Sequence, residues 1–155
     1  MLFGSAQGFP PQVEVHDLDG DNGFLVEGGS ITAVGPAGDL NGDGLGDMIL
    51  GDAAADVAGL SRAGRGYVIF GSDQGFPRSL DLAALDGARG FLLEGTMPHE
   101  QAGFAVTRAG DLNADGIDDV LVCAPTADAE GTPGAGRVYV MFGRRGDFPP
   151  AMSLK

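Results

Sequence analysis

Residues Gly110-Asp-Leu-Asn-Ala-Asp-Gly-Ile-Asp-Asp119 form an acidic loop between two short apolar stretches, Phe104-Ala-Val106 and Val120-Leu-Val122. A near copy, Gly38-Asp-Leu-Asn-Gly-Asp-Gly-Leu-Gly-Asp47, lies earlier in the chain and runs into Met48-Ile-Leu50. An acidic turn that recurs between apolar stretches indicates a repeated unit in which the loop joins two β-strands.

The spacing of the oxygen-bearing residues suits calcium, a hard cation that takes six to eight oxygen ligands at flexible geometry. Positions 1, 3, 5 and 9 of each loop supply side-chain oxygens, and position 7 supplies a backbone carbonyl. The predicted ligands are Asp39, Asn41, Asp43, Leu45 (carbonyl) and Asp47 in the first loop, and Asp111, Asn113, Asp115, Ile117 (carbonyl) and Asp119 in the second. We therefore expect two calcium ions, with dissociation constants of about 10⁻⁴ to 10⁻³ M.

Position 6 of each loop is a glycine, Gly44 or Gly116, where a loop around an ion must turn sharply. The helix–loop–helix calcium motif is excluded, because its glutamate at position 12 is replaced by Leu50 or Val122 inside an apolar stretch. The alternative is an Asp/Asn/Gly turn without metal, since these residues favour turns anyway. Two loops with identical oxygen spacing favour the calcium hypothesis.

The repeat extends beyond the loops. Phe3-Gly-Ser-Ala-Gln-Gly-Phe-Pro10 matches Phe70-Gly-Ser-Asp-Gln-Gly-Phe-Pro77, and Gly64-Arg-Gly-Tyr-Val-Ile-Phe-Gly71 matches Gly136-Arg-Val-Tyr-Val-Met-Phe-Gly143. We expect one all-β repeat region over residues 1–155, with units at about 3–69 and 70–141 and the start of a third at 142–155. The predicted strands are Ile31–Val34, Asp47–Leu50, Gly66–Phe70 and Gly90–Glu94, then Gly103–Thr107, Asp119–Cys123 and Arg137–Phe142, with Phe24–Glu27 ending an earlier unit. The fourth strand of the second unit would lie beyond Lys155.

Four-stranded units with a long period are typical of β-propeller blades. Gly103-Phe-Ala-Val106, the loop Gly110–Asp119, Cys123-Ala-Pro125 and Val138-Tyr-Val-Met-Phe-Gly143 resemble the FG-GAP repeats of integrin α-subunit propellers and of related bacterial extracellular proteins. The first unit departs from the motif, because it has Gly51-Asp-Ala53 and lacks the Phe-Gly pair. Two repeats cannot close a seven-bladed ring, so the chain is expected to be a fragment, an associating copy or an open stack.

The resemblance implies a non-catalytic module with calcium loops at the lower rim and partner recognition on the opposite face. We expect it to serve extracellular or cell-surface adhesion, or recognition of a protein or glycan. Its neighbours would be blades from a longer chain or from other copies. The alternative hypothesis is a non-catalytic portion of a larger secreted enzyme, carbohydrate-active or phospholipase-like, that carries such repeats.

Composition narrows the remaining possibilities. A net charge of −13 argues against nucleic acid as a partner. No apolar run reaches the length of a membrane span, and no signal peptide is visible. Cys123 is the single cysteine and is expected to be buried, and the two histidines make no zinc motif. We interpret Arg145-Gly-Asp147 as a turn and Asp17-Leu-Asp-Gly-Asp21 as a hairpin turn.

Two pairs of charged residues recur at fixed positions in the repeat, Arg65 with Arg137 and Asp56 with Asp128. We expect a structural ion pair rather than a ligand clamp from these recurring arginine and aspartate residues. No set of residues predicts a catalytic site.

Overall fold

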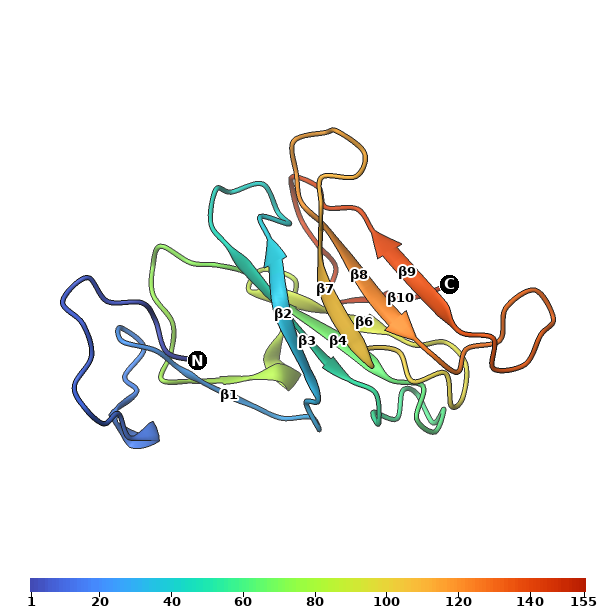
Figure 1. Cartoon of the computed structure of the whole chain (residues 1–155), viewed down its shortest axis with the longest axis horizontal. Coiled ribbons are helices and arrows are strands. Elements are labelled where there is room, and N and C mark those ends of the chain that lie inside the picture. The colour runs from blue at the N-terminus through green and yellow to red at the C-terminus, as the bar shows by residue number, and fades with distance from the viewer. The chain divides into compact units, whose positions relative to one another are not determined.

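A computed structural model describes residues 1–155 and shows an all-β protein (Figure 1). Its strands are β1 (Leu25–Glu27), β2 (Ala33–Gly38), β3 (Asp47–Asp52), β4 (Arg65–Ile69), β5 (Ser79–Asp81), β6 (Gly90–Glu94), β7 (Ala105–Gly110), β8 (Asp119–Ala124), β9 (Arg137–Met141) and β10 (Ala151–Ser153). Two single-turn 3₁₀ helices are present, η1 (Val15–Asp17) and η2 (Leu82–Ala84). The chain divides into two compact units, one of Met1–Gly28 with Ser72–Ala84 and the other of Gly29–Gly71 with Leu85–Lys155.

The larger unit contains one complete blade. Strands β2, β3, β4 and β6 form its antiparallel sheet, and β10 adds a parallel strand to β6 at the edge. The four predicted strands are confirmed, but the first was placed too early, since β2 begins at Ala33 and continues to Gly38. The predicted strand ended at Val34, before Gly35 and Pro36, whereas β2 includes both. Proline is tolerated here because β2 lies at the edge of the sheet, where an N–H is not required.

The second sheet of this unit has the order β7-β8-β9, with both pairs antiparallel. β7 lies beside β2 of the blade (Figure 1). Glycines permit the close approach: a Cβ on Gly35 would lie 2.8 Å from the carbonyl oxygen of Val106, and one on Gly51 would lie 1.9 Å from that of Gly103. The sheets thus meet at backbone distance where the sequence provides no side chain.

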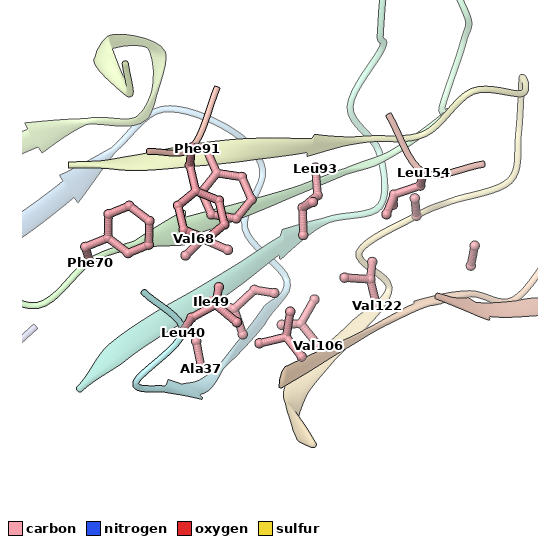
Figure 2. Close-up of a cluster of buried hydrophobic side chains, with 14 of the residues drawn as sticks. Ala37, Leu40, Ile49, Val68, Phe70, Phe91, Leu93, Val106, Val122 and Leu154 are labelled. Carbon is pink, nitrogen blue, oxygen red and sulfur yellow. The ribbon is translucent and has the colours of Figure 1, made fainter. Parts of the chain in front are cut away.

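Buried apolar side chains from both sheets form one core (Figure 2). The first sheet contributes Ile49, Val68 and Leu93 among others, the loop between β2 and β3 contributes Leu40, and the second sheet contributes residues such as Val122. Burial of this apolar surface is what holds two neighbouring repeats together.

The same arrangement of three phenylalanine rings occurs in both units, so the sequence repeat is also a structural repeat. In the larger unit the rings of Phe91 and Phe148 stack with centroids 4.7 Å apart, and Phe70 tilts against both. In the smaller unit Phe24 and Phe76 stack at 4.3 Å, and Phe3 tilts against both in the same way. The phenylalanines of the two triads occupy corresponding positions of the sequence repeat, as the repeat predicts.

The parallel strands β5 and β10 were not predicted. β5 pairs with β1 in the smaller unit, and β10 pairs with β6 in the larger, at equivalent points of the repeat. Each strand is too short to show an alternating pattern. The 3₁₀ helices η1 and η2 likewise lie at equivalent points of the repeat, where no helical period was visible.

The expected ion pair between recurring arginine and aspartate residues was wrong. Arg65 pairs instead with Glu94 across strands β4 and β6, with 2.9 Å between Nη2 and Oε1. Asp56 accepts a hydrogen bond from the backbone N–H of Arg62, and thereby closes a loop. Pairing of adjacent strands brings Arg65 and Glu94 together although they are far apart in sequence.

The other minor expectations can be placed in the structure. Asp19 closes the predicted hairpin turn by accepting hydrogen bonds from the N–H groups of Asp21 and Asn22. Cys123 is a free thiol and is half-buried on β8 rather than fully buried. No helix is long and apolar enough to cross a membrane.

Candidate metal-binding loops

The two acidic loops occupy equivalent positions. The first connects β2 to β3 and the second connects β7 to β8, so each lies between the first two strands of its sheet. A β-bulge precedes each loop, since pairing shifts register before Gly38 and before Gly110. Both glycines have positive φ, 76° and 75°, which turns the chain out of the strand and into the loop.

The aspartate at position 1 organises each loop through backbone hydrogen bonds. Asp39 accepts from the N–H groups of Asp43 and Gly44, both at 2.9 Å. Asp111 accepts from those of Asp115 and Gly116, at 3.0 and 2.8 Å. The same carboxylate therefore caps the same two donors in both loops.

Positions 3 and 5 also repeat their contacts. In the first loop Asn41 accepts from the N–H of Asp43 and donates its Nδ2 to the Asp43 carboxylate at 2.9 Å. In the second loop Asn113 makes the same two contacts with Asp115, with 2.8 Å between the side chains. Asn41 and Asn113 thus bring a side-chain amide against the carboxylate at position 5.

The aspartate at position 9 is buried in both loops. Asp47 accepts from the N–H groups of Leu40 and Gly71, both at 2.8 Å, and so joins the start of the loop to the end of β4. Asp119 accepts from Leu112 and Gly143 in the same way, at 2.7 and 3.0 Å. Each carboxylate holds three segments of its sheet together.

Opposing interactions set the pKa of the Asp47 carboxyl group. Its pKa is raised to about 6: burial is the largest cause, the charges of Asp43 and Asp39 act in the same direction, and the N–H groups of Gly71 and Leu40 oppose the rise. The carboxylates of Asp39, Asp43 and Asp47 therefore repel one another, and a bound cation would relieve that repulsion.

Glycine and one alanine supply the turns within the loops. Gly44 and Gly116, at position 6, have φ of 89° and 85°, as the calcium hypothesis requires. At position 4 the first loop has Gly42 with φ of 72°, whereas the second has Ala114 with φ of 61°. Ala114 is thus held in the left-handed region, which costs an L-residue free energy.

The carboxylates do not meet at one point. No group of three or more His, Cys, Asp or Glu side chains lies close enough together to hold a metal ion. The carboxylates of the loops are instead engaged by backbone N–H groups. Each oxygen retains a second lone pair, so the all-oxygen donor set at positions 1, 3, 5, 7 and 9 still suits calcium chemically.

Asp118, which was not among the predicted site residues, connects the two loops. Its Oδ2 accepts from the N–H of Asp39 at 2.9 Å, and its own N–H donates to the Asp39 carbonyl at 3.2 Å. Its Oδ1 lies 2.7 Å from Nη2 of Arg108. Partial burial acts to raise the pKa of Asp118, but the Asp39 N–H and the Arg108 guanidinium hold it below its usual value. The first loop has Gly46 at this position, and that difference was the available signal.

Known proteins that contain FG-GAP repeats are similar in sequence to this chain. Residues 103–141 match the model of the FG-GAP repeat. The chain is 41% identical over 107 residues to phosphatidylinositol-glycan-specific phospholipase D of Bos taurus, covering 69% of this chain and 12% of that protein. It is 33% identical over 135 residues to integrin alpha-IIb of Homo sapiens, covering 84% of this chain and 12% of the integrin.

The match at 103–141 covers β7, β8, β9 and the second acidic loop. The likeness to integrin alpha-IIb extends the correspondence over most of the chain. The chain spans about 12% of the length of these relatives, so their activities belong to much longer proteins. Repeat sequence, blade topology and likeness agree, and the chain belongs to the FG-GAP repeat proteins of the integrin alpha type.

Proposed function

We propose that the chain is a non-catalytic, calcium-binding β-propeller module that serves extracellular adhesion or recognition of a protein or glycan. The observation that carries the proposal is the equivalence of the two loops. Each repeats the same donor types at positions 1, 3, 5, 7 and 9 and the same backbone contacts. The backbone hydrogen bonds account for part of this pattern, but three carboxylates close together in each loop repel one another, and a cation would relieve that repulsion.

Calcium would act by cross-linking the ends of the strands. Asp39 follows the last residue of β2, and Asp47 is the first residue of β3, so the two lie at opposite ends of the first loop. An ion bound to both would neutralise part of their charge and fix the turn between the strands. Because the ion binds the folded loop, it would stabilise the fold by mass action.

The proposed extracellular location of this chain rests on its similarity to integrin alpha chains. Calcium at millimolar concentration outside cells suits the expected affinity of about 10⁻⁴ to 10⁻³ M. The integrin alpha chains that this chain resembles support a role in adhesion at the cell surface.

A second candidate function is a non-catalytic portion of a larger secreted enzyme. The likeness to phosphatidylinositol-glycan-specific phospholipase D favours it, since 69% of this chain aligns with that protein. In this case the repeats would position or stabilise a catalytic domain, and catalytic groups would lie in other parts of the protein.

Loop variants test the calcium assignment. Asp43→Ala and Asp115→Ala each remove the position-5 carboxylate of one loop, and each should reduce the calcium stoichiometry from two to one. Asp128→Ala is the matched control, since Asp128 is an exposed aspartate outside the loops that accepts one backbone N–H, from Gly134. Equal calcium binding by all four proteins would contradict the assignment.

A further inference from the structure

The first acidic loop contains an asparagine followed by a glycine, a pair in which the backbone can react with the side chain. The chain has three asparagines, and the residues that follow them are Gly23, Gly42 and Ala114. Attack of a backbone nitrogen on the preceding asparagine amide is easiest at glycine, because glycine has no Cβ to obstruct the approach. The sequence therefore makes Asn22 and Asn41 equal candidates for deamidation.

The side chain of Asn41 folds forward over the peptide that would attack it. Its Oδ1 accepts from the N–H of Asp43 at 3.0 Å, and its Nδ2 donates to the Asp43 carboxylate at 2.9 Å. Both contacts reach two residues along the chain, so the amide carbon of Asn41 is held over the intervening Gly42 peptide. The N–H of Asp43 would also stabilise the negative charge that develops on Oδ1 during attack.

The backbone nitrogen of Gly42 is free to react. The N–H groups of Asp43, Gly44 and Leu45 all donate to carboxylates within the loop. The N–H of Gly42 makes no hydrogen bond, and the residue is only half-buried. No existing bond has to break before this nitrogen attacks.

Asn22 is held in the opposite direction. Its Nδ2 donates to the carbonyl of Asp17 at 2.8 Å, and its Oδ1 accepts from the N–H of Asp19 at 3.2 Å. Both partners precede Asn22 in the chain, so these bonds draw the amide away from Gly23, which is itself buried. The folded structure thus distinguishes two Asn-Gly pairs that look alike in the sequence.

Asn113 provides an internal comparison in the second loop. Its side chain makes the same forward contacts with Asp115, at 3.2 Å from the N–H and 2.8 Å from the carboxylate. The next residue is Ala114, whose Cβ obstructs attack by its nitrogen. Asn113 is exposed whereas Asn41 is half-buried, so exposure and the identity of the following residue favour different asparagines.

We propose that Asn41 is a site of spontaneous deamidation, selected by its contacts with Asp43 and by the glycine that follows it. The nitrogen of Gly42 forms a bond to Cγ of Asn41, and its proton leaves with the Nδ2 group as ammonia. The product is a succinimide ring. Water then adds to either carbonyl of the ring and opens it, which gives aspartate or isoaspartate at position 41.

Either product should loosen the first loop. Aspartate replaces the Nδ2 donor with a carboxylate that faces the carboxylate of Asp43, so an attraction becomes a repulsion. Isoaspartate adds a carbon atom to the main chain just before the N–H of Asp43, which now donates to Asp39. The reaction needs only water, and it is independent of whether the loop binds calcium.

Peptide mapping by mass spectrometry tests the selectivity, after the whole chain has been incubated in chelator at mildly alkaline pH. The mass increase of an amide-to-acid change should accumulate at Asn41 at least about tenfold faster than at Asn113 or Asn22, a difference of about 1.4 kcal/mol in barrier. In urea Asn22 and Asn41 should react at similar rates, because only the shared Asn-Gly sequence remains. Chelator keeps this test separate from the calcium assignment.

A glycine exchange between the loops tests the cause. Ala114→Gly should bring Asn113 at least to the rate of Asn41, and Gly42→Ala should protect Asn41. Since Gly42→Ala places a Cβ 3.0 Å from Cγ of Arg145, the Ala114→Gly protein provides the test if the first variant fails to fold. Similar rates at Asn41 and Asn113, no acceleration in Ala114→Gly, or a preference for Asn41 over Asn22 that persists in urea would each overturn the proposal.

Asn41→Asp reproduces the aspartate product and measures its effect on the loop. Its melting temperature in chelator should be lower than that of the unmodified protein, because the contact from Nδ2 to Asp43 is lost. An unchanged melting temperature would contradict the predicted loosening of the loop.

Discussion

Asp118 accepts a hydrogen bond from the backbone N–H of Asp39 at 2.9 Å, and this contact joins the second acidic loop to the first. Asp39 is the first predicted ligand of its loop, so the second loop fixes the position at which the first begins. Gly38 permits the contact, because a Cβ there would lie 2.2 Å from Oδ2 of Asp118. A direct hydrogen bond thus links the two acidic loops.

Removing this connection should destabilise the larger unit. Asp118→Ala should lower the free energy of unfolding by about 1.5 kcal/mol, since it removes a charge-assisted hydrogen bond to Asp39. Arg108→Ala removes only the half-exposed ion pair and should cost less than about 1 kcal/mol. Urea unfolding of both variants measures the difference. Equal losses would show that the bond to Asp39 contributes nothing beyond the ion pair.

The contribution of Asp118 should also depend on pH. Its pKa in the folded protein is below the ordinary value of 3.8, so its stabilisation is present above that pH and is lost as pH falls through the lower folded value. The gap in stability between the unmodified protein and Asp118→Ala should therefore narrow in strong acid.

Ala114 offers a stabilising substitution. Its φ of 61° lies in the left-handed region that favours glycine, and the equivalent residue of the first loop is Gly42. Ala114→Gly should raise the free energy of unfolding by about 0.5 to 1 kcal/mol. The reverse change, Gly42→Ala, should destabilise by about 1 kcal/mol or more, since its Cβ would also lie 3.0 Å from Cγ of Arg145. Chemical denaturation of both variants checks the opposite signs.

Any side chain at Gly51 should disrupt the close packing between the two sheets. A Cβ there would lie 1.9 Å from the carbonyl oxygen of Gly103, which is backbone and cannot turn aside. Gly51→Ala should therefore cost about 3 kcal/mol or prevent folding. Gly46→Ala is the control, since its Cβ would meet nothing within 4 Å, and it should retain the circular dichroism spectrum and melting temperature of the unmodified protein. A folded, equally stable Gly51→Ala protein would contradict the described packing.

Tyr139 should titrate at unusually high pH. Its hydroxyl donates to the carboxylate of the buried Glu100, and desolvation followed by the charge of Glu100 raises its pKa above 10. Glu100→Gln should move that pKa back toward its ordinary value. Absorbance titration at alkaline pH in a Tyr67→Phe background isolates the signal, because the chain has two tyrosines. An unchanged titration in the Gln variant would show that Glu100 has no influence on Tyr139.

Much of the fold was predictable because the repeat is local and doubled. The acidic loops, the antiparallel strands and the glycines at position 6 follow from patterns that are short in sequence. The recurrence of these loops and strands along the sequence also predicted a β-propeller blade.

The features that escaped prediction depend on pairing between distant segments. β5 and β10 are too short to show a period, and Arg65 finds Glu94 only when β4 and β6 align. The role of Asp118 was not predictable from its own loop, because its partner Asp39 lies in the other repeat, far away in sequence. Burial also differs between equivalents: Leu40 is 0% exposed whereas Leu112 is 58% exposed, since only the first loop has a neighbouring sheet that covers it.

Calcium titration by calorimetry, combined with thermal melts in calcium and in chelator, tests the central claim most directly. We predict two sites with dissociation constants of about 10⁻⁴ to 10⁻³ M and a melting temperature that rises with calcium concentration. Absence of heat and an unchanged melting temperature at millimolar calcium would contradict the claim, and the acidic loops would then be turns that their backbone hydrogen bonds hold without an ion.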